Sequence, residues 1–253
     1  MEYQPIDQHG WELIIVFGSF TVGYTIYYVI FHSNKIAQWF RQRLPGPSAE
    51  VWRNLLYRTV LVVFFFAVPA VLLSVVSGMG LGDYGVAFHF SWPRLAVIGG
   101  LSIFLVGLIA INPGRSKLTG YYPHMRIGVW SPGHVVINVL SWAAYLFAYE
   151  LMFRGYMLTV LMPAGVVVAV AVNIAIYVAV HVPKGVSEAI GAVPFGLVVC
   201  YLTLTYGTIW AAFFLHLALA LANSFVALRG NPEMRISWIT SRADRSASQT
   251  TTE

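Results

Sequence analysis

Residues 56–77 read LYRTVLVVFFFAVPAVLLSVVS, and beyond Arg58 this stretch carries no charged side chain. A helix of about 20 such residues crosses the hydrocarbon core of a bilayer. Comparable stretches precede and follow it, separated by short connections that contain charged residues, Gly or Pro. Because lipid cannot hydrogen-bond backbone polar groups, spans of this kind must be helical. The sequence therefore predicts an all-α, polytopic transmembrane helical bundle.

The composition of the whole chain supports this class. Of its 253 residues, 58% are hydrophobic and only 10% are charged, whereas soluble domains carry about a quarter charged residues. The formal net charge is +5, but the basic residues gather in particular loops rather than on one helix face. We interpret them as orientation signals and predict no nucleic-acid partner. The one cysteine, Cys200, excludes an intrachain disulfide.

Seven spans are predicted, with ends good to a few residues. They cover residues of about 11–31, 56–77, 94–112, 134–161, 164–181, 187–205 and 208–228. Ser131 followed by Pro132 has the pattern of an N-cap and first-turn proline that open the fourth span. The sequence Met162-Pro163-Ala164-Gly165 predicts a tight turn after it, and Tyr206-Gly207-Thr208 predicts the break before the last span.

The distribution of Lys and Arg predicts the orientation of the bundle. Basic residues occur between spans one and two, between spans three and four, after span five and in the tail: Lys35, Arg41, Arg43, Arg53, Arg115, Lys117, Arg126, Lys184, Arg229, Arg235, Arg242 and Arg245. This predicts an outer N-terminus and a cytoplasmic C-terminus. Met1 to Gly10 contains no Lys or Arg, so we expect the first span to be retained.

Three regions are expected along the chain. Residues 1–129 form N-terminal transmembrane helices and loops, and residues 130–228 form a core that carries the site. Residues 229–253 form a cytoplasmic tail; from Ser241 on it is polar and rich in Ser and Thr, which predicts disorder. The compact loops are typical of an integral multi-pass protein of a bacterial inner membrane, with membrane lipids as its surroundings.

Ionisable residues inside the spans are the candidates for function, because each costs several kcal/mol unless it finds a partner. Glu150 and Arg154 lie four residues apart on the fourth span and can pair on one helix face. His181 ends the fifth span, and His216 lies near the centre of the seventh. If they converge, the glutamate can act as a general base and the imidazoles can stabilise an oxyanion. Glu150, His181 and His216 also form a zinc-type ligand set.

Structural interpretations of these residues stay open. Glu150 and Arg154 can form an ion pair that only joins helices, and His216 can be an interhelical hydrogen bonder. Asn223 follows His216 on the same face and can orient a substrate or make a structural hydrogen bond. Ser187 and Glu188 have the pattern of an N-cap and a first-turn acid of the sixth span, although Glu188 can also fold towards the site.

The order of three motifs resembles the CPBP family of intramembrane proteases, which includes CAAX-processing endoproteases and bacteriocin-processing or self-immunity proteins. The motifs lie within residues 130–228: Tyr149-Glu150-Leu151-Met152-Phe153-Arg154, then Tyr177 to His181, then Gly207-Thr208-Ile209-Trp210-Ala211-Ala212-Phe213-Phe214-Leu215-His216. The resemblance implies an all-helical membrane domain with a site open towards the cytosol. In that site a glutamate activates water with histidine assistance, and this glutamate mechanism needs no cofactor.

Three positions depart from the family pattern. The pattern has a glutamate where this chain has Tyr149, an Asn or Asp where it has Ala220, and a Phe where it has Tyr177. Some sequences that resemble the family combine an aromatic residue before a single glutamate with a His-x-x-Lys-x-x-x-Glu stretch. Here that stretch runs from His181 through Lys184 to Glu188. The resemblance then implies that Glu188 is the replacement carboxylate.

We therefore predict an intramembrane endopeptidase that acts on peptides or protein tails. Its catalytic residues are Glu150, Arg154, His181 and His216, and its possible supporting residues are Glu188, Asn223 and Tyr149. The alternative is a non-catalytic relative that binds a membrane protein partner as a scaffold, chaperone or immunity factor. A transporter or proton path is a third class, which the absence of a sequence repeat disfavours.

Overall fold

The computed structural model describes residues 6–89, 91–111 and 120–237, and over these residues the chain is an all-α bundle. Seven helical stretches in this part of the chain are long and apolar enough to cross a membrane. They are Gln8–His32, Pro47–Ser77, Trp92–Ile111, Pro132–Ala164, Val166–Lys184, Val186–Tyr206 and Trp210–Gly230. The predicted fold class and the number of spans are confirmed, but the second span begins at Pro47, well before the predicted start near residue 56.

The elements follow one another along the chain in this order. The first half contains α1 (Gln8–His32), α2 (Asn34–Arg43), α3 (Pro47–Val62), the π-helix η1 (Val63–Ala67), α4 (Val68–Ser77), η2 (Gly82–Val86) and α5 (Trp92–Ile111). The second half contains β1 (Val129–Trp130), α7 (Pro132–Glu150), the π-helix η3 (Leu151–Met157), α8 (Leu158–Leu161), η4 (Met162–Ala164), α9 (Val166–Ala179), η5 (Val182–Lys184), α10 (Val186–Tyr206), α11 (Trp210–Gly230) and β2 (Arg235–Ile236).

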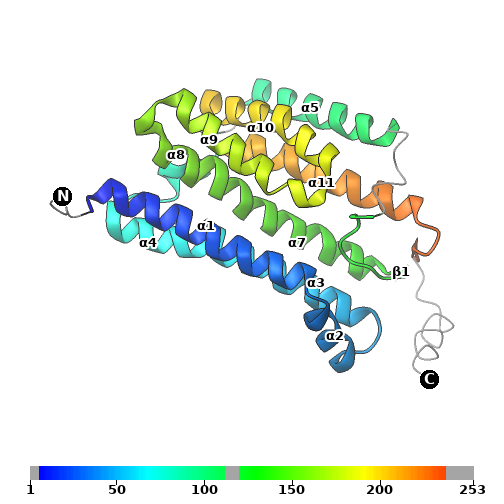
Figure 1. Ribbon diagram of the computed structural model, residues 1–253. Helices are drawn as coiled ribbons and strands as arrows, with labels where there is room; N and C mark the ends of the chain where they lie inside the picture. The colour runs from blue at the N-terminus through cyan, green and yellow to red at the C-terminus, as the bar shows by residue number, and fades with distance from the viewer. Residues whose placement is uncertain (1–5, 90, 112–119, 238–253) are drawn as a thin grey trace.

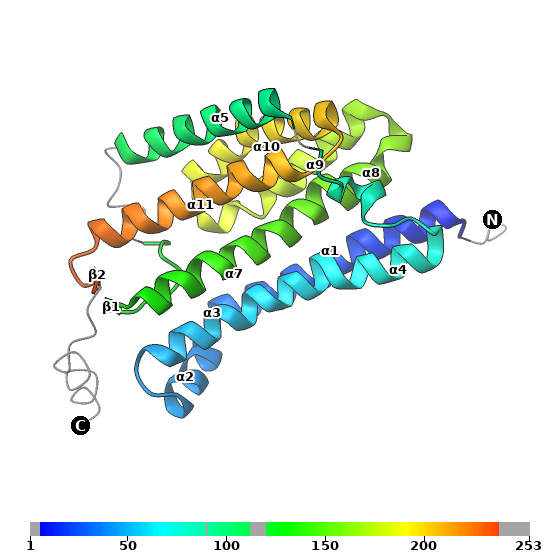
Figure 2. The ribbon, with the colours of Figure 1, turned by 180° about the vertical axis from the view of Figure 1, so that it is seen from behind.

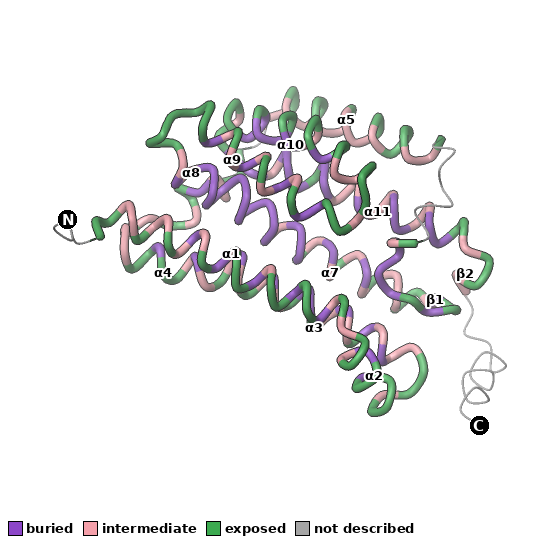
Figure 3. The backbone as a smooth tube through the Cα atoms, in the orientation of Figure 1, coloured by how far each residue is buried: buried purple, intermediate pink, exposed green. Residues whose placement is uncertain are grey.

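Helix α7 occupies the centre of the bundle (Figure 1). The α1 and α3/α4 rods lie along one of its sides, whereas α11 and then α5 lie along the other, and the view from behind shows the same order (Figure 2). Burial follows this arrangement, since the last three residues of α7 and all of η3 are buried (Figure 3). By contrast, α5 has no buried residue. The polar residues of the fourth span therefore lie in the protein interior and not in lipid.

The start of α7 has the predicted cap. The Ser131 hydroxyl accepts a hydrogen bond from the backbone N–H of His134, Pro132 occupies the first turn, and the His134 ring accepts from the Ser131 N–H in return. Such reciprocal capping satisfies two backbone donors that a helix start would leave free. The predicted turns are also present, because Gly165 and Gly207 follow η4 and α10 with positive φ.

The predicted N-cap of α10 is wrong. Helix α10 begins at Val186 and its N-cap is Gly185, which has a φ of 115°. The Gly185 carbonyl already accepts from the backbone N–H of Ala189 at 3.1 Å, so Ser187 lies inside the first turn. Glycine adopts this backbone conformation without a steric penalty. Glu188 is in the first turn, as predicted.

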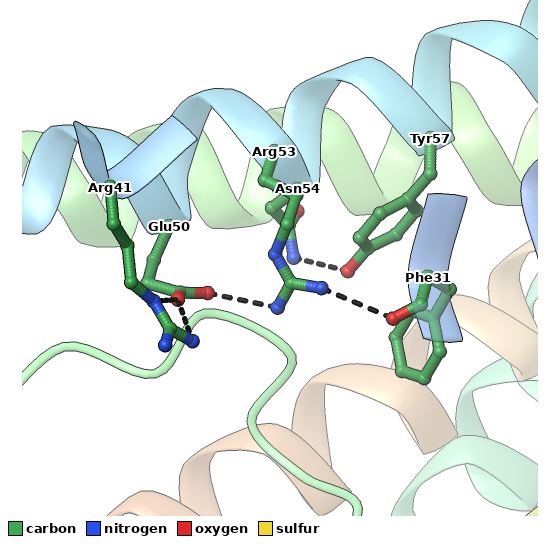
Figure 4. Close-up of polar contacts among 6 residues, drawn as sticks. All are labelled: Phe31, Arg41, Glu50, Arg53, Asn54 and Tyr57. Carbon is green, nitrogen blue, oxygen red and sulfur yellow. Dashed lines mark hydrogen bonds and ion pairs between the residues drawn. The ribbon is translucent and has the colours of Figure 1, made fainter. Parts of the chain in front are cut away.

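The connection between the first two spans is mostly helical rather than an open loop. Glu50 of α3 accepts hydrogen bonds from Arg41 of α2 and from Arg53, at 3.2 and 2.9 Å for the closest nitrogens (Figure 4). Arg53 also donates to the backbone carbonyl of Phe31 at the end of α1, at 3.1 Å. These contacts tie α1, α2 and α3 together at one end of the bundle.

The described structure continues past residue 228 to residue 237. Helix α11 continues to Gly230, and β2 pairs in parallel with β1, with Val129 opposite Arg235 and Trp130 opposite Ile236. This pairing and the burial of Trp130 hold the end of α11 beside the start of α7. Arg115, Lys117, Arg242, Arg245 and the tail from Ser241 lie outside the described residues. The orientation of the bundle remains a prediction.

Candidate active site

Glu150 and Arg154 form a buried ion pair, as their spacing predicts. Glu150 is the last residue of α7, and Arg154 lies in the π-helical segment η3 that follows it. The Arg154 Nε lies 3.4 Å from Glu150 Oε2, and both side chains are fully buried. The Arg154 guanidinium also lies over the Tyr177 ring, 4.4 Å from its centroid. The carboxylate thus has a fixed cation on one side.

The other carboxylate oxygen contacts His216 of α11. Its Oε1 lies 2.5 Å from His216 Nδ1, although the two residues are 66 positions apart in the sequence. A carboxylate accepts hydrogen bonds, so Nδ1 carries the proton and the Nε2 of neutral His216 is left as an acceptor. Glu150 therefore lies between Arg154 and His216 and fixes the orientation and tautomer of the imidazole.

A cavity of about 470 Å³ lies on the far side of His216. Residues of α5, α7, α9, α10 and α11 form its wall. Those lining it are Leu105, Ile109, Tyr122, Trp142, Tyr145, Leu146, Tyr149, Tyr177, His181, Lys184, Ser187, Glu188, Gly191, Ala192, Phe195, His216, Leu219, Ala220 and Asn223. Neither Glu150 nor Arg154 lines this cavity, and Glu150 has 0% of its surface exposed. The structure thus places the Glu150 carboxylate behind His216.

His181 lines the same cavity from the end of α9. Its Nδ1 lies 2.7 Å from the backbone carbonyl of Tyr177, which can only accept a hydrogen bond. The proton of neutral His181 is therefore on Nδ1, and Nε2 is again the acceptor. His181 and His216 are both packed against the Tyr177 ring, at 4.5 and 6.2 Å between ring centroids. Two imidazoles with the same tautomer thus line one cavity.

The supporting residues expected from the sequence also reach this cavity. Asn223 is buried and lines it two turns beyond His216 on α11. Tyr149 lies edge to face against the His216 ring, at 5.5 Å between centroids. Among the described lining residues, Glu188 is the only one with a carboxylate, and Lys184 lines the cavity without an ion pair to it within 4 Å.

Other residues of the site were missed by the sequence reasoning. Tyr122 lines the cavity from the connection before α7, and burial, with the Glu188 carboxylate nearby, holds the pKa of its phenol above the usual range. Trp142 lines the cavity from α7, and the buried Arg58 guanidinium lies 4.1 Å from its ring centroid. A signal for Arg58 was present, because it is an arginine inside an apolar span.

The described residues do not fit the predicted zinc-type ligand set. In the part of the chain that the structure describes, no group of three or more His, Cys, Asp or Glu side chains has an arrangement that could hold a metal ion. The reason is local, since both oxygens of Glu150 face protein partners, Arg154 and His216.

Comparison with known proteins finds a family that part of the chain resembles. The family model described as type II CAAX prenyl endopeptidase Rce1-like matches residues 130–222. This segment includes Glu150, Arg154, His181 and His216, and it ends one residue before Asn223. Neither the curated proteins nor the solved structures give a match to the chain. With its seven apolar helices the chain is an integral multi-pass membrane protein. Over residues 130–222 the predicted resemblance to the CPBP family is confirmed, and this match supports a CAAX-protease-like intramembrane endopeptidase at the level of the family.

Proposed function

We propose that this protein cleaves peptides or protein tails within the membrane and that the Glu150–His216 pair activates the attacking water. The observation that carries the proposal is the 2.5 Å contact between Glu150 Oε1 and His216 Nδ1, with His216 lining a cavity of about 470 Å³. A carboxylate hydrogen-bonded to one ring nitrogen of a histidine directs the other ring nitrogen towards the substrate. It also stabilises the imidazolium that forms when the histidine takes up a proton.

The proposed reaction is a general-base hydrolysis. His216 Nε2 removes a proton from a water molecule while the water oxygen attacks the carbonyl carbon of the scissile peptide bond. The carbonyl oxygen becomes an oxyanion in a tetrahedral intermediate. As the intermediate collapses, the C–N bond breaks and the imidazolium of His216 gives its proton to the leaving nitrogen. Glu150 stays ionised throughout, and Arg154 holds its second oxygen.

The other residues have positioning roles in this scheme. The Nε2 of His181 accepts a hydrogen bond from the second O–H of the water, because its Nδ1–H already donates to the Tyr177 carbonyl. Asn223 can donate its amide N–H to the oxyanion from the same face of α11. The aromatic side chains of Trp142 and Phe195 suit an apolar part of the substrate, such as a large side chain or a lipid.

This scheme differs from direct attack by a Glu150-bound water, which the sequence analysis favoured. Burial of Glu150 behind His216 argues for the indirect role. A second carboxylate, Glu188, does line the cavity and can act as the base without His216. Substituting Glu150 and Glu188 one at a time distinguishes these routes, since cleavage should require only one of the two carboxylates.

A non-catalytic binding protein is the second candidate. It is favoured by Tyr149, which faces the cavity where the family pattern has a glutamate, and by Ala220, which lines the cavity without a polar group. In that case Glu150, Arg154 and His216 would hold three elements together, and a membrane protein partner would occupy the cavity. Membrane lipids surround the bundle in both cases, and we expect a bacterial inner membrane as its location.

The test compares peptide termini in native membranes that contain wild-type protein, Glu150→Gln, His216→Gln or the exposed control His89→Gln. We expect one or more cleavage products to require both Glu150 and His216 and to persist in the control. Thermal unfolding of each purified variant excludes loss by misfolding. If no product depends on Glu150 and His216 in folded protein, the protease proposal fails and the binding protein takes its place.

A further inference from the structure

A second, much smaller cavity lies behind the wall of the first. Its volume is about 10 Å³, which is at the lower limit for one water molecule. Tyrosines dominate its lining, which consists of Tyr24, Tyr27, Tyr28, His32, Tyr121, Tyr145, Tyr149, Val180, Pro183 and Lys184. Tyr28, His32 and Pro183 are exposed, whereas Tyr145 and Tyr149 are buried. The small cavity thus leads from the outside of α1 towards the interior.

Tyr149 supplies an unpartnered polar group at the inner end. Its side chain is 4% exposed, and its hydroxyl has no hydrogen-bond partner among the described residues. Leaving a hydroxyl unpaired in the protein interior costs about 1–3 kcal/mol. Stacking against Phe153, at 4.6 Å between centroids, fixes the ring, so the hydroxyl cannot simply rotate out to solvent. A water in the small cavity would remove this cost.

The two cavities share part of their lining. Tyr145, Tyr149 and Lys184 line both of them, so these side chains form the partition between the small cavity and the His216 cavity. Tyr149 also contacts the His216 ring edge to face. The Tyr149 side chain therefore joins the small cavity to the imidazole that removes a proton in the proposed reaction.

We propose that the small cavity holds a water that is destined for hydrolysis before it passes to His216, and that the Tyr149 hydroxyl binds it there. The inference rests on the proposed function for its role, but the site itself does not. Peptide hydrolysis consumes one water per cycle, and a substrate that fills the larger cavity blocks the direct path. The small cavity supplies water from the α1 side while substrate is bound. The Tyr149 hydroxyl then provides a water-binding group at the position where the family pattern has a glutamate.

The binding site is tested without any activity measurement. Hydroxyl-radical footprinting by X-ray pulses oxidises buried side chains that contact bound water, and it is applied to the full chain in lipid nanodiscs. We expect Tyr149 to be oxidised at least about tenfold faster than Tyr156, which is also buried but donates its hydroxyl to the Phe66 carbonyl and lines neither cavity. Val180→Ile adds a methylene to the small cavity alone and should abolish the difference. Equal oxidation of Tyr149 and Tyr156, or no effect of Val180→Ile, overturns the site.

The catalytic role is tested by steady-state cleavage. Tyr149→Phe removes only the hydroxyl, and Val180→Ile fills the space. Misplacing a reacting group lowers rates by up to about a hundredfold, so we expect both variants to lower kcat at least about tenfold with KM unchanged. Val178→Ile on the same helix lines neither cavity and should match wild type. Wild-type kcat in Val180→Ile refutes the role. Fast oxidation of Tyr149 in a protein that cleaves nothing supports the water site and refutes only the proposed function.

Discussion

Replacing Glu150 by glutamine should cost far more stability than replacing any surface acid. The change keeps the shape of the side chain but leaves the Arg154 guanidinium buried without a countercharge. Breaking a buried pair on one side costs about 3–5 kcal/mol. Arg154 keeps its position over the Tyr177 ring, a contact worth up to about 2 kcal/mol when it is desolvated, so we expect a value near the lower end. The double variant Glu150→Gln with Arg154→Met should recover most of the loss, since no charge is left unpaired.

The measurement is equilibrium unfolding of the purified protein in bicelles. Glu50→Gln is the matched control, because Glu50 pairs with Arg41, whose side chain is 63% exposed (Figure 4). Exposed pairs are worth about 1 kcal/mol or less, although Glu50 also holds the less exposed Arg53. The reasoning is refuted if Glu150→Gln is as stable as wild type, or if the double variant is no more stable than the single one. Cleavage should be lost in both variants, which separates the chemical role of Glu150 from its structural one.

Three further predictions concern other parts of the structure. Gly155→Ala should destabilise the bundle by about 1–3 kcal/mol in the same unfolding assay, because a Cβ there would lie 2.8 Å from the backbone oxygen of Tyr84. Burial, with Arg58 nearby, holds the pKa of His124 well below its usual range. The unfolded chain takes up a proton below about pH 6.5 and the folded one does not. Stability should therefore fall between pH 7 and pH 5, by up to about 1.4 kcal/mol per unit, and less steeply in His124→Phe. Glu188→Ala should leave the cleavage rate within about threefold of wild type, since the general-base step, which contributes about 10²–10⁴-fold in rate, is assigned to His216. A folded but inactive Glu188→Ala variant would make Glu188 the base.

The spans could be predicted because each depends on the local run of apolar residues alone. The Ser131 cap and the Gly207 break are likewise local signals, and both are present. The predicted start of the second span was wrong, because the first turns of α3 carry Glu50 and Arg53, which lower the local hydropathy although these turns are helical. The predicted start of α10 failed because the positive φ of Gly185 is a backbone property that composition does not reveal.

The candidate site was harder to predict, because its geometry depends on contacts between distant helices. The spacing of Glu150 and Arg154 gave their pairing, but nothing in the sequence places Glu150 against His216. That contact changes the expected chemistry, since it puts the carboxylate behind the imidazole. The family resemblance gave the motifs and their order, whereas the partition formed by Tyr145 and Tyr149 required the packing of α7 against its neighbours.

The π-helical segment η3 has a consequence for how this site can change over evolution. A π-helical turn is wider than an α-helical turn and accommodates one more residue, so η3 holds one extra residue between α7 and α8. Deleting one residue between Glu150 and Arg154 would reduce their separation from four positions to three, which turns Arg154 by about 100° about the helix axis relative to Glu150. Glu150 would keep its place on the preceding turns, but Arg154 would leave the carboxylate. The register of the Glu150–Arg154 pair is therefore set by the length of this segment as much as by the identity of its residues.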